Sequence, residues 1–197
     1  MNDRINVAFC LTGSFCTLSK LRDPVLTLIE NGANITPVFS KAVYETDTRF
    51  GKAEKWIKEM EELTGNKIIR TIAEAEPIGP KNLFDITVVA PCTGNTLTKI
   101  AMGITDTAPT MAVKATLRNG NPVVLAVSTN DGLSGCAKNI GALLNSKNIY
   151  FVPFSQDDPN GKPTSLVAHF DELFGTVENA LKGIQIQPLL RIKKTEQ

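Results

Sequence analysis

The chain has 197 residues, 42% of them hydrophobic, and its 21 Lys and Arg residues nearly balance its 20 Asp and Glu residues. This length fits a single domain with a full hydrophobic core. The formal net charge of +1 lacks the basic excess of a nucleic-acid-binding protein. No stretch reaches the roughly 18 apolar residues of a membrane-spanning helix. The N-terminus has no basic segment followed by a long apolar core, so we expect no secretory signal.

Cysteine and histidine usage favours a metal-free protein of the cytoplasm. Cys10, Cys16, Cys92 and Cys136 form no close-spaced set, so we expect reduced thiols in a cytoplasmic protein. The chain has one histidine and no C-x-x-C motif, which argues against a zinc site. We therefore expect no metal centre.

Short apolar runs alternate with helix-like segments along the chain. Pro24 interrupts the first helix: either the helix kinks there, or Asp23 caps a helix that begins at Pro24. In chain order, we expect a strand at 5–11, a helix ending at 31–32, a strand at 35–39, a helix at 51–63, a short strand at 67–69, a loop or broken helix at 71–82, a strand at 86–90, helices after 96 and at 107–119, a strand at 122–127, a helix at 134–146, a strand at 149–152, a loop at 153–164, a helix at 165–182 and a tail at 183–197.

This alternation of buried strands and helices predicts an α/β fold. We expect a three-layer, Rossmann-like sandwich with a central parallel sheet of five or six strands and right-handed crossovers. No linker or internal repeat divides the chain, so residues 1–197 are expected to form one domain.

Residues 85–106 are the stretch around which the chain is organised. The buried strand at 86–90 meets Pro91, which has no N–H to donate to a ladder. The small, hydroxyl-rich turn 92–96 then opens a helix. Ligands of open α/β sheets bind at such carboxyl ends of strands, and the free N–H groups of a helix start favour an anion.

Three other strand ends carry similar small polar turns, and all four are expected on one edge of the sheet. Neutral donors of this kind suit a single phosphate group. The chain contains no G-x-x-x-x-G-K-[ST] and no G-x-G-x-x-G, which excludes a P-loop and an ordinary dinucleotide site. A mononucleotide such as FMN fits better. The alternative is that these residues serve only as helix caps and turns. The four turns are Gly13-Ser14, Ser40-Lys41, Thr93 to Thr96 and Ser128 to Asn130.

The segment Ala90-Pro-Cys-Thr-Gly-Asn-Thr96 resembles the Ala-Pro-x-Thr-x-Asn-Thr signature of the homo-oligomeric flavin-containing cysteine decarboxylase superfamily. The resemblance extends over most of residues 5–152. It implies an FMN-binding fold, assembly into a homo-oligomer and a flavin site near the phosphate-side turns. The residues that it assigns to the cofactor are Gly13, Ser14, Ser40, Thr93, Asn95, Thr96, Ser128 and Asn130.

The chain departs from the decarboxylases of that superfamily in two places. Val127 and Thr129 stand where those enzymes have the Pro and Met of a Pro-x-Met-Asn motif. Their catalytic histidine on an earlier loop is absent, because the first histidine here is His169, which we interpret as a structural residue on the last helix. Decarboxylation of a cysteinyl substrate is therefore not expected.

Within the superfamily, the turns 11–16 and 128–132 resemble those of the flavoprotein component of a two-component dehydrogenase from endospore-forming bacteria. This resemblance implies a partner protein that binds NAD(P), a small cyclic dicarboxylate substrate that is oxidised to an aromatic ring, and a place in the cytoplasm of the sporulating mother cell. The alternatives are a non-catalytic assembly component that has lost the cofactor, or an FMN-dependent decarboxylase.

A dianionic substrate requires cations or helix N-termini in its pocket, and its aromatisation requires a base. No base stands out, so no catalytic residue is assigned. A solvated helix face is the alternative role for each candidate cation. The candidates are Lys41, Lys99, Lys114, Arg118 and Lys138.

Overall fold

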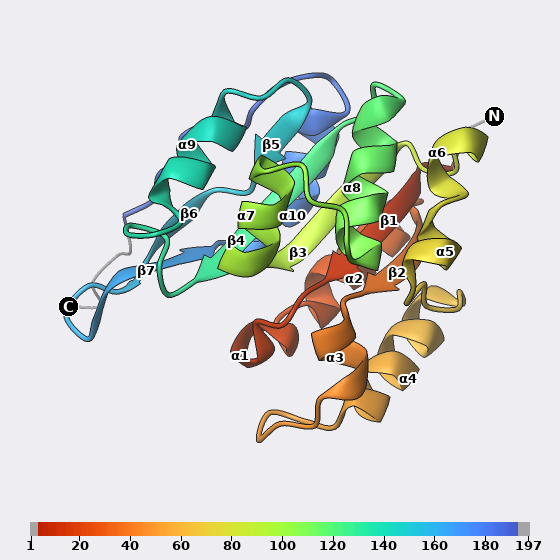
Figure 1. Ribbon diagram of the computed structural model, residues 1–197, viewed down its shortest axis with the longest axis horizontal. Helices are drawn as coiled ribbons and strands as arrows, with labels where there is room; N and C mark the ends of the chain where they lie inside the picture. Colours follow the sequence, from red (N-terminus) through yellow and green to blue (C-terminus); the bar gives the residue numbers. More distant parts are fainter. Residues whose placement is uncertain (1–3, 193–197) are drawn as a thin grey trace.

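The computed structural model describes residues 4–192 and consists of a central sheet with helices packed on both faces (Figure 1). The strand order is β2-β1-β3-β4-β7-β6, and β5 also pairs with β4. The strands are β1 (Asn6–Leu11), β2 (Asn34–Phe39), β3 (Ile86–Cys92), β4 (Val123–Thr129), β5 (Ile149–Phe151), β6 (Phe154–Asp158) and β7 (Lys162–Ala168).

The α/β class predicted from the sequence is confirmed, and β1 to β5 form the expected parallel core. The β6–β7 hairpin joins this core in antiparallel orientation, so the sheet is mixed rather than parallel throughout. The chain reverses its direction of travel across the sheet at β1, between β2 and β3. The carboxyl ends of β1 and β3 therefore border the switch point at which open α/β sheets bind ligands.

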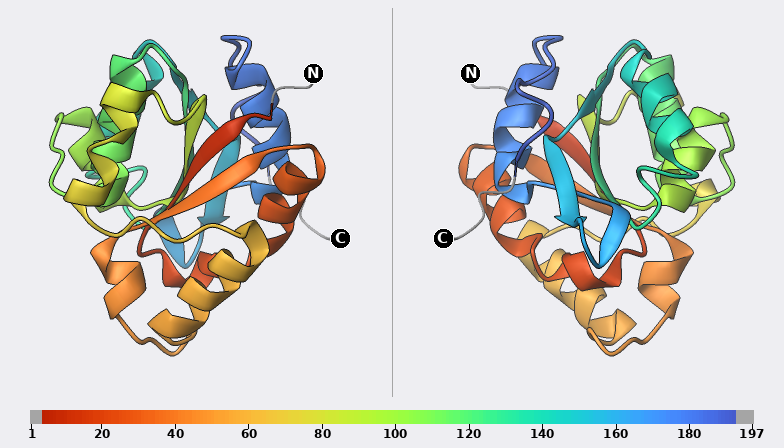
Figure 2. Two further views of the ribbon diagram at one scale, coloured as in Figure 1. Left: turned by 90° about the vertical axis from the view of Figure 1, so that its right-hand side faces the viewer. Right: turned by 90° about the vertical axis from the view of Figure 1, so that its left-hand side faces the viewer.

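Side chains that alternate along the strands divide the core into two layers. On β1, Val7 and Phe9 pack with α2, α4 and α10, whereas Ala8 and Cys10 pack with α5 to α9. The two side views show these helix layers on either side of the sheet (Figure 2). The helices are α1 (Phe15–Leu18), α2 (Arg22–Glu30), α3 (Lys41–Glu45), α4 (Ala53–Thr64), α5 (Ile72–Ala75), α6 (Ile78–Lys81), α7 (Gly94–Ala101), α8 (Ala108–Arg118), α9 (Ala137–Leu144) and α10 (Leu173–Ala180), with a 3₁₀ turn η1 (Phe170–Glu172).

Helix boundaries follow local chemistry. α4 ends at Gly65, whose φ of 71° is the left-handed conformation that glycine adopts at low cost. α8 begins at Thr107, whose side chain accepts a hydrogen bond from the N–H of Thr110. α2 begins at Arg22, which places Pro24 in its first turn, where a missing N–H leaves no bond unmade. The two alternatives for Pro24 were a kink within one helix and the start of a new helix. The structure shows a new helix, which starts at Arg22.

Residues 153–168 were expected as a loop running into a helix, and this expectation is wrong. They form the β6–β7 hairpin instead, and the polar residues between the strands make its turn, where the N–H of Gly161 donates to Asp158 Oδ1 at 2.9 Å. The predicted helix at 165–182 is reduced to η1 and α10. The physical reason is that β5 is too short to cover the end of β4, which leaves backbone groups of β4 unpaired. Ser128 and Thr129 at this end pair with Val167 and Leu166 of β7.

The sequence predicted no helix or strand in the tail at 183–197. The described part of the tail, up to residue 192, packs on the protein's own sheet. The side-chain amide of Gln185 bonds both the N–H and the carbonyl of Phe151, each at 2.8 Å. Leu190 forms a parallel bridge with Phe154. Residues 193–197 lie outside the described part of the chain.

Two smaller segments also differ from expectation. Pro91 does not end β3: the strand continues to Cys92, with a shift in register between Val89 and Cys92, as expected for proline at an irregular ladder position. The strand expected at 67–69 is a single bridge between Ile69 and Val38. Within residues 4–192, no helix combines the length and apolar character needed to cross a membrane.

A buried hydroxyl pair joins the sheet to α8 and offers a test of the core. Thr87 and Thr116 are 0% and 1% exposed, and their Oγ1 atoms lie 2.6 Å apart. Thr87→Val strands the Thr116 hydroxyl in an apolar site, and we expect a loss of about 1–3 kcal/mol in the free energy of unfolding. The double variant Thr87→Val/Thr116→Val removes both hydroxyls and should recover most of that loss in urea denaturation. A double variant that is less stable than the single variant would contradict this account.

Candidate functional site

The turns after β1 and β4 meet at the carboxyl edge of the sheet. Ser14 Oγ and Ser128 Oγ lie 2.8 Å apart although 114 residues separate them in the sequence. In such a pair one hydroxyl donates to the other, so one O–H remains available for a ligand. The structure therefore brings together two of the residues that the sequence assigned to a phosphate.

A residue that the sequence analysis missed, Thr12, ties the β1 turn to the end of β3. Its side chain is 1% exposed, and its Oγ1 donates to the carbonyl of Pro91 at 2.6 Å and accepts from the N–H of Thr93 at 3.0 Å. These bonds close the crevice between β1 and β3. The signal in the sequence was a hydroxyl placed directly between an apolar strand and Gly13.

The turn after β3 mainly caps α7. Thr93 Oγ1 accepts from the N–H of Thr96 at 3.3 Å and donates to Thr96 Oγ1 at 3.2 Å. Thr96 is 7% exposed, whereas Asn95 is an exposed residue of the first helical turn. Within this turn, the interpretation as helix cap accounts for Thr93 and Thr96.

A pocket of about 480 Å³ opens beside the Ser14–Ser128 pair, between α1, the β4 turn and the β6–β7 hairpin. Residues that the sequence did not single out also line it, among them Lys20, Phe50 and Lys162. We call this cavity the strand-end pocket. Of the eight predicted cofactor residues, those that line it are Gly13, Ser14, Thr93, Ser128 and Asn130.

Ser40, Asn95 and Thr96 are the predicted residues that do not line the strand-end pocket. The Ser40 Oγ atom is buried and has no hydrogen-bond partner among the described residues. Its backbone N–H bonds the carbonyl of Leu11 at 3.0 Å, which holds the end of β2 against β1. Ser40 therefore offers an unused donor beside the site rather than within it.

Thr129, Asp131 and Cys136 form a small polar cluster next to the pocket, which Thr129 lines. The carboxylate of Asp131 accepts from the hydroxyl of Thr129, and its Oδ2 accepts from Cys136 Sγ at 3.2 Å. Both hydrogen bonds lower the pKa of Asp131, and the bond from Thr129 has the larger effect. Burial, followed by the bond to Asp131, raises the pKa of Cys136. The thiol therefore stays protonated and acts as a donor to the carboxylate, not as a nucleophile.

None of the five cations proposed from the sequence lines the strand-end pocket. Lys99 is paired with Asp106 at 2.7 Å and Lys41 with Glu45 at 3.6 Å. The pocket instead contains Lys20 and Lys162, of which Lys162 is paired with Asp157 at 3.3 Å. The sequence pattern gave no signal for either lysine, because their approach depends on the hairpin.

His169 does not lie on a helix, contrary to expectation, but follows β7 directly. Its Nε2 lies 3.0 Å from Ser155 Oγ, which joins the base of the hairpin. It lines an adjoining hollow of about 520 Å³ between α2, β7 and α10, which shares Lys20, Asp157 and Val167 with the strand-end pocket. His169 does not line the strand-end pocket.

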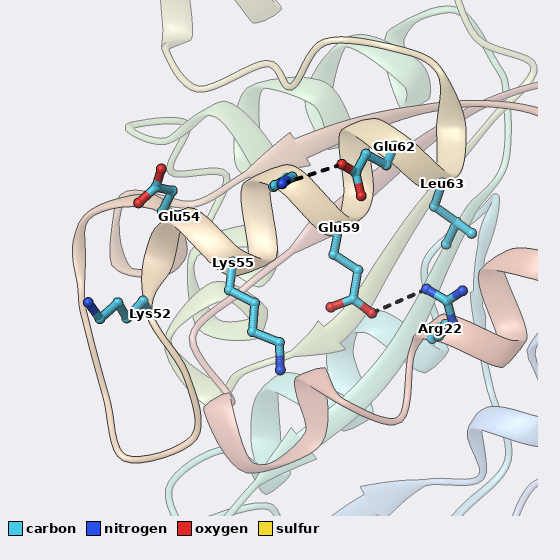
Figure 3. A pocket seen from close by; sticks show the side chains of 8 residues that line it. Arg22, Lys52, Glu54, Lys55, Glu59, Glu62 and Leu63 are labelled. Carbon is cyan, nitrogen blue, oxygen red and sulfur yellow. Dashed lines mark ion pairs between the residues drawn. The ribbon is translucent and has the colours of Figure 1, made fainter.

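Another hollow, of about 660 Å³, lies over the outer face of α4, and none of the predicted site residues line it (Figure 3). Charges of both signs line it, with ion pairs of 3.7 Å between Arg22 and Glu59 and 3.8 Å between Lys58 and Glu62. Such exposed, alternating charges describe a solvated helix face. Residues 4–192 contain no cluster of three or more metal-ligating side chains.

Comparison with known proteins identifies the family. The sequence profile of the Flavoprotein family matches residues 1–176. The chain belongs to the Flavoprotein family. It is 47% identical over 184 residues to the B subunit of dipicolinate synthase from Bacillus subtilis (strain 168), a match that covers 93% of this chain and 92% of that protein.

Solved structures agree with this assignment. The crystal structure of the B subunit of dipicolinate synthase from Bacillus halodurans superposes with a TM-score of 0.88 at 46% identity, over 96% of this chain and 97% of that one. The FMN complex of DmrB from Burkholderia xenovorans shares the fold alone, with a TM-score of 0.64 at 20% identity, over 92% of this chain and 98% of that one. The chain is therefore similar in sequence to two B subunits of dipicolinate synthase and shares its fold with an FMN-binding protein.

Gly94, at the start of α7, packs against the polar cluster of Thr129, Asp131 and Cys136. A Cβ at this position would lie 2.6 Å from Thr129 Oγ1, 2.7 Å from Asp131 Oδ1 and 2.8 Å from Cys136 Sγ. We expect Gly94→Ala to cost about 1–3 kcal/mol in thermal or urea unfolding, because the overpacked turn must shift.

The matched control for this substitution is Gly141→Ala. Gly141 lies within α9, and no atom lies within 4 Å of the added methyl group. Alanine there should stabilise the helix by about 0.5–1 kcal/mol. Equal effects at the two glycines would show that the contacts around Gly94 are not tight in solution.

The lowered pKa of Asp131 makes stability depend on pH. A depressed carboxyl pKa stabilises the folded state above the ordinary value of about 3.9, and this contribution is lost as the pH falls through the folded-state pKa. We expect Asp131→Asn to reduce stability near neutral pH and to narrow its gap to the wild type in acid. Urea unfolding at several pH values measures the gap, and a gap that stays constant with pH would contradict the assignment.

Proposed function

We propose that this flavoprotein is the B subunit of dipicolinate synthase, that it binds FMN, and that it acts with a nicotinamide-binding A subunit to oxidise dihydrodipicolinate to dipicolinate in the sporulating mother cell. The observation that carries the proposal is the Ser14–Ser128 hydroxyl pair, whose oxygens lie 2.8 Å apart in the lining of the strand-end pocket. The likeness to two B subunits of dipicolinate synthase, at 47% and 46% identity, supports the choice of reaction.

The donors around the strand-end pocket fit the phosphate of a mononucleotide. Hydroxyls of Ser14 and Ser128 face the space at the N-terminal end of α7, where the helix dipole adds positive potential. The buried, unpartnered Ser40 hydroxyl lies at the end of the neighbouring strand β2. Neutral donors bind a phosphate without bringing a fixed cation into the floor of the site.

The chemistry of the reaction divides between the cofactor and the chain. Aromatising the dihydropyridine ring removes a hydride and a proton, and a flavin or nicotinamide supplies the hydride acceptor when bound. In this proposal the chain binds the phosphate through Ser14 and Ser128 and orients the ligand against the hairpin. Thr12 and Thr93 hold the ends of β1 and β3 together.

We also infer that the flavoprotein assembles into a homo-oligomer. Its exposed surface includes large apolar side chains, with Met102 68% and Leu133 50% exposed. Isolated apolar residues are normal on a surface, but Ile104, at 45% exposed, lies close to Met102 in the sequence, on the connection between α7 and α8.

Removing the hydroxyl pair tests the flavin site. We expect Ser14→Ala/Ser128→Ala to weaken FMN binding by about tenfold or more, because hydrogen bonds to charged groups contribute about 1.5–3 kcal/mol. Quenching of flavin fluorescence by the purified chain gives the Kd. Ser146→Ala is the matched control, since that hydroxyl bonds the carbonyl of Ala142 on α9 and lies outside the strand-end pocket. Equal affinities in all three proteins would overturn the assignment.

The second candidate is an assembly subunit without a cofactor, favoured by the pocket's lack of a histidine and by Thr129 in the β4 turn. Reconstitution with the nicotinamide-binding partner separates the two. If the flavin-free double variant supports full dehydrogenase activity, this chain acts in assembly. If activity falls with flavin content and returns with excess FMN, the cofactor is required.

A further inference from the structure

Two lysines that line the strand-end pocket from different elements have no role in binding a flavin phosphate. Lys20 follows α1, and Lys162 begins β7 at the tip of the hairpin. With Asp157, they are the charged side chains that line the pocket within the described residues, which gives the pocket a formal charge of +1. The hydroxyls of Ser14 and Ser128 provide the floor between these walls.

We propose that Lys20 and Lys162 form a dicarboxylate subsite at the rim of the strand-end pocket, and that Asp157 is the internal counter-ion that a substrate carboxylate replaces. The inference rests on the proposed function, because it names the residues that select the substrate of the same site. Each lysine is expected to contact one of the two carboxylates that flank the ring nitrogen, so that a ligand bridges the segment after α1 and the hairpin.

Both lysines stand on segments that are fixed to the floor of the pocket. The N–H of Lys20 bonds the carbonyl of Thr17 at 3.0 Å, and Thr17 Oγ1 bonds the carbonyl of Ser14 at 2.8 Å. On the hairpin, Thr164 Oγ1 donates to the carbonyl of Asn130 at 2.6 Å. The two ammonium groups therefore extend from anchored backbone, which limits the span that a ligand has to bridge.

The existing ion pair of Lys162 is of a kind that a ligand can replace. Lys162 Nζ and Asp157 Oδ2 lie 3.3 Å apart, with side chains 54% and 37% exposed. Exposed pairs of this geometry contribute little to stability and are screened by salt. A ligand with two carboxylates can pair with Lys162 and with Lys20 at the same time. Lys20 makes no ion pair in the part of the chain that the structure describes.

Two probes that differ by one carboxylate test the subsite. Pyridine-2,6-dicarboxylate presents both groups, and pyridine-2-carboxylate presents one. Calorimetric titration of the full chain at low ionic strength should give about tenfold tighter binding of the dicarboxylate. Lys20→Met and Lys162→Met should each reduce that preference to about twofold or less, and Lys162→Arg should keep it. Asp157→Asn should tighten the binding of both probes, since Lys162 then has no competing carboxylate.

Lys41→Met provides the matched control, because Lys41 pairs with Glu45 and lies outside the pocket. It should leave both affinities unchanged. Equal affinities for the two probes in the wild type, or a preference that survives both Lys20→Met and Lys162→Met, would overturn the inference.

The Kd for FMN in the same variants separates this inference from the proposed function. If the lysines select the substrate, Lys20→Met and Lys162→Met keep the wild-type affinity for FMN. If these variants lose FMN and retain the preference for the dicarboxylate, the lysines serve the flavin phosphate and the inference fails. If the wild type binds no FMN but shows the preference, which both lysine substitutions abolish, the flavin assignment fails and the dicarboxylate subsite stands.

Discussion

The hydroxyl of Thr12 is the constraint on which the architecture of the site depends. It joins segments 79 and 81 residues apart, donating to the carbonyl of Pro91 and accepting from the N–H of Thr93. Open α/β sheets usually offer a ligand the crevice between the two strands at the switch point. Here Thr12 fills that crevice, so the space for a ligand lies further along, where Ser14 meets Ser128.

The unequal lengths of β4 and β5 determine what forms the far wall of the pocket. β5 pairs with Val123 to Leu125 and leaves the last residues of β4 without a partner on that side. Unpaired backbone groups at a sheet edge favour another strand, and β7 supplies it through Leu166 and Val167. The pairing that completes the sheet therefore also carries Lys162 and Ser165 to the ligand space.

The sequence predicted the parallel core well, because strands such as 86–90 are apolar on both faces and end in recognisable turns. It failed at 165–168, since a short apolar run fits a strand or a buried helix equally, and the choice was made by the free edge of β4. It also failed to separate Ser14, which lines the pocket, from Ser40, which does not. A position after a strand fixes the sheet edge of a residue but not the direction of its side chain.

In the arrangement that we propose, one pocket holds two anions, and different polar groups bind each of them. A phosphate among hydroxyls and helix N–H groups is neutralised by dipoles, which occupy the floor of the pocket and need no flexible side chain. Lysines are long and strongly hydrated, and their charge is best used at a rim, where the group can stay partly in water. Dipoles at Ser14 and Ser128, with ammonium groups at Lys20 and Lys162, keep two anionic ligands from competing for the same counter-charge. Because Asp157 already neutralises one of the lysines in the free protein, the pocket carries little excess charge until a second carboxylate arrives.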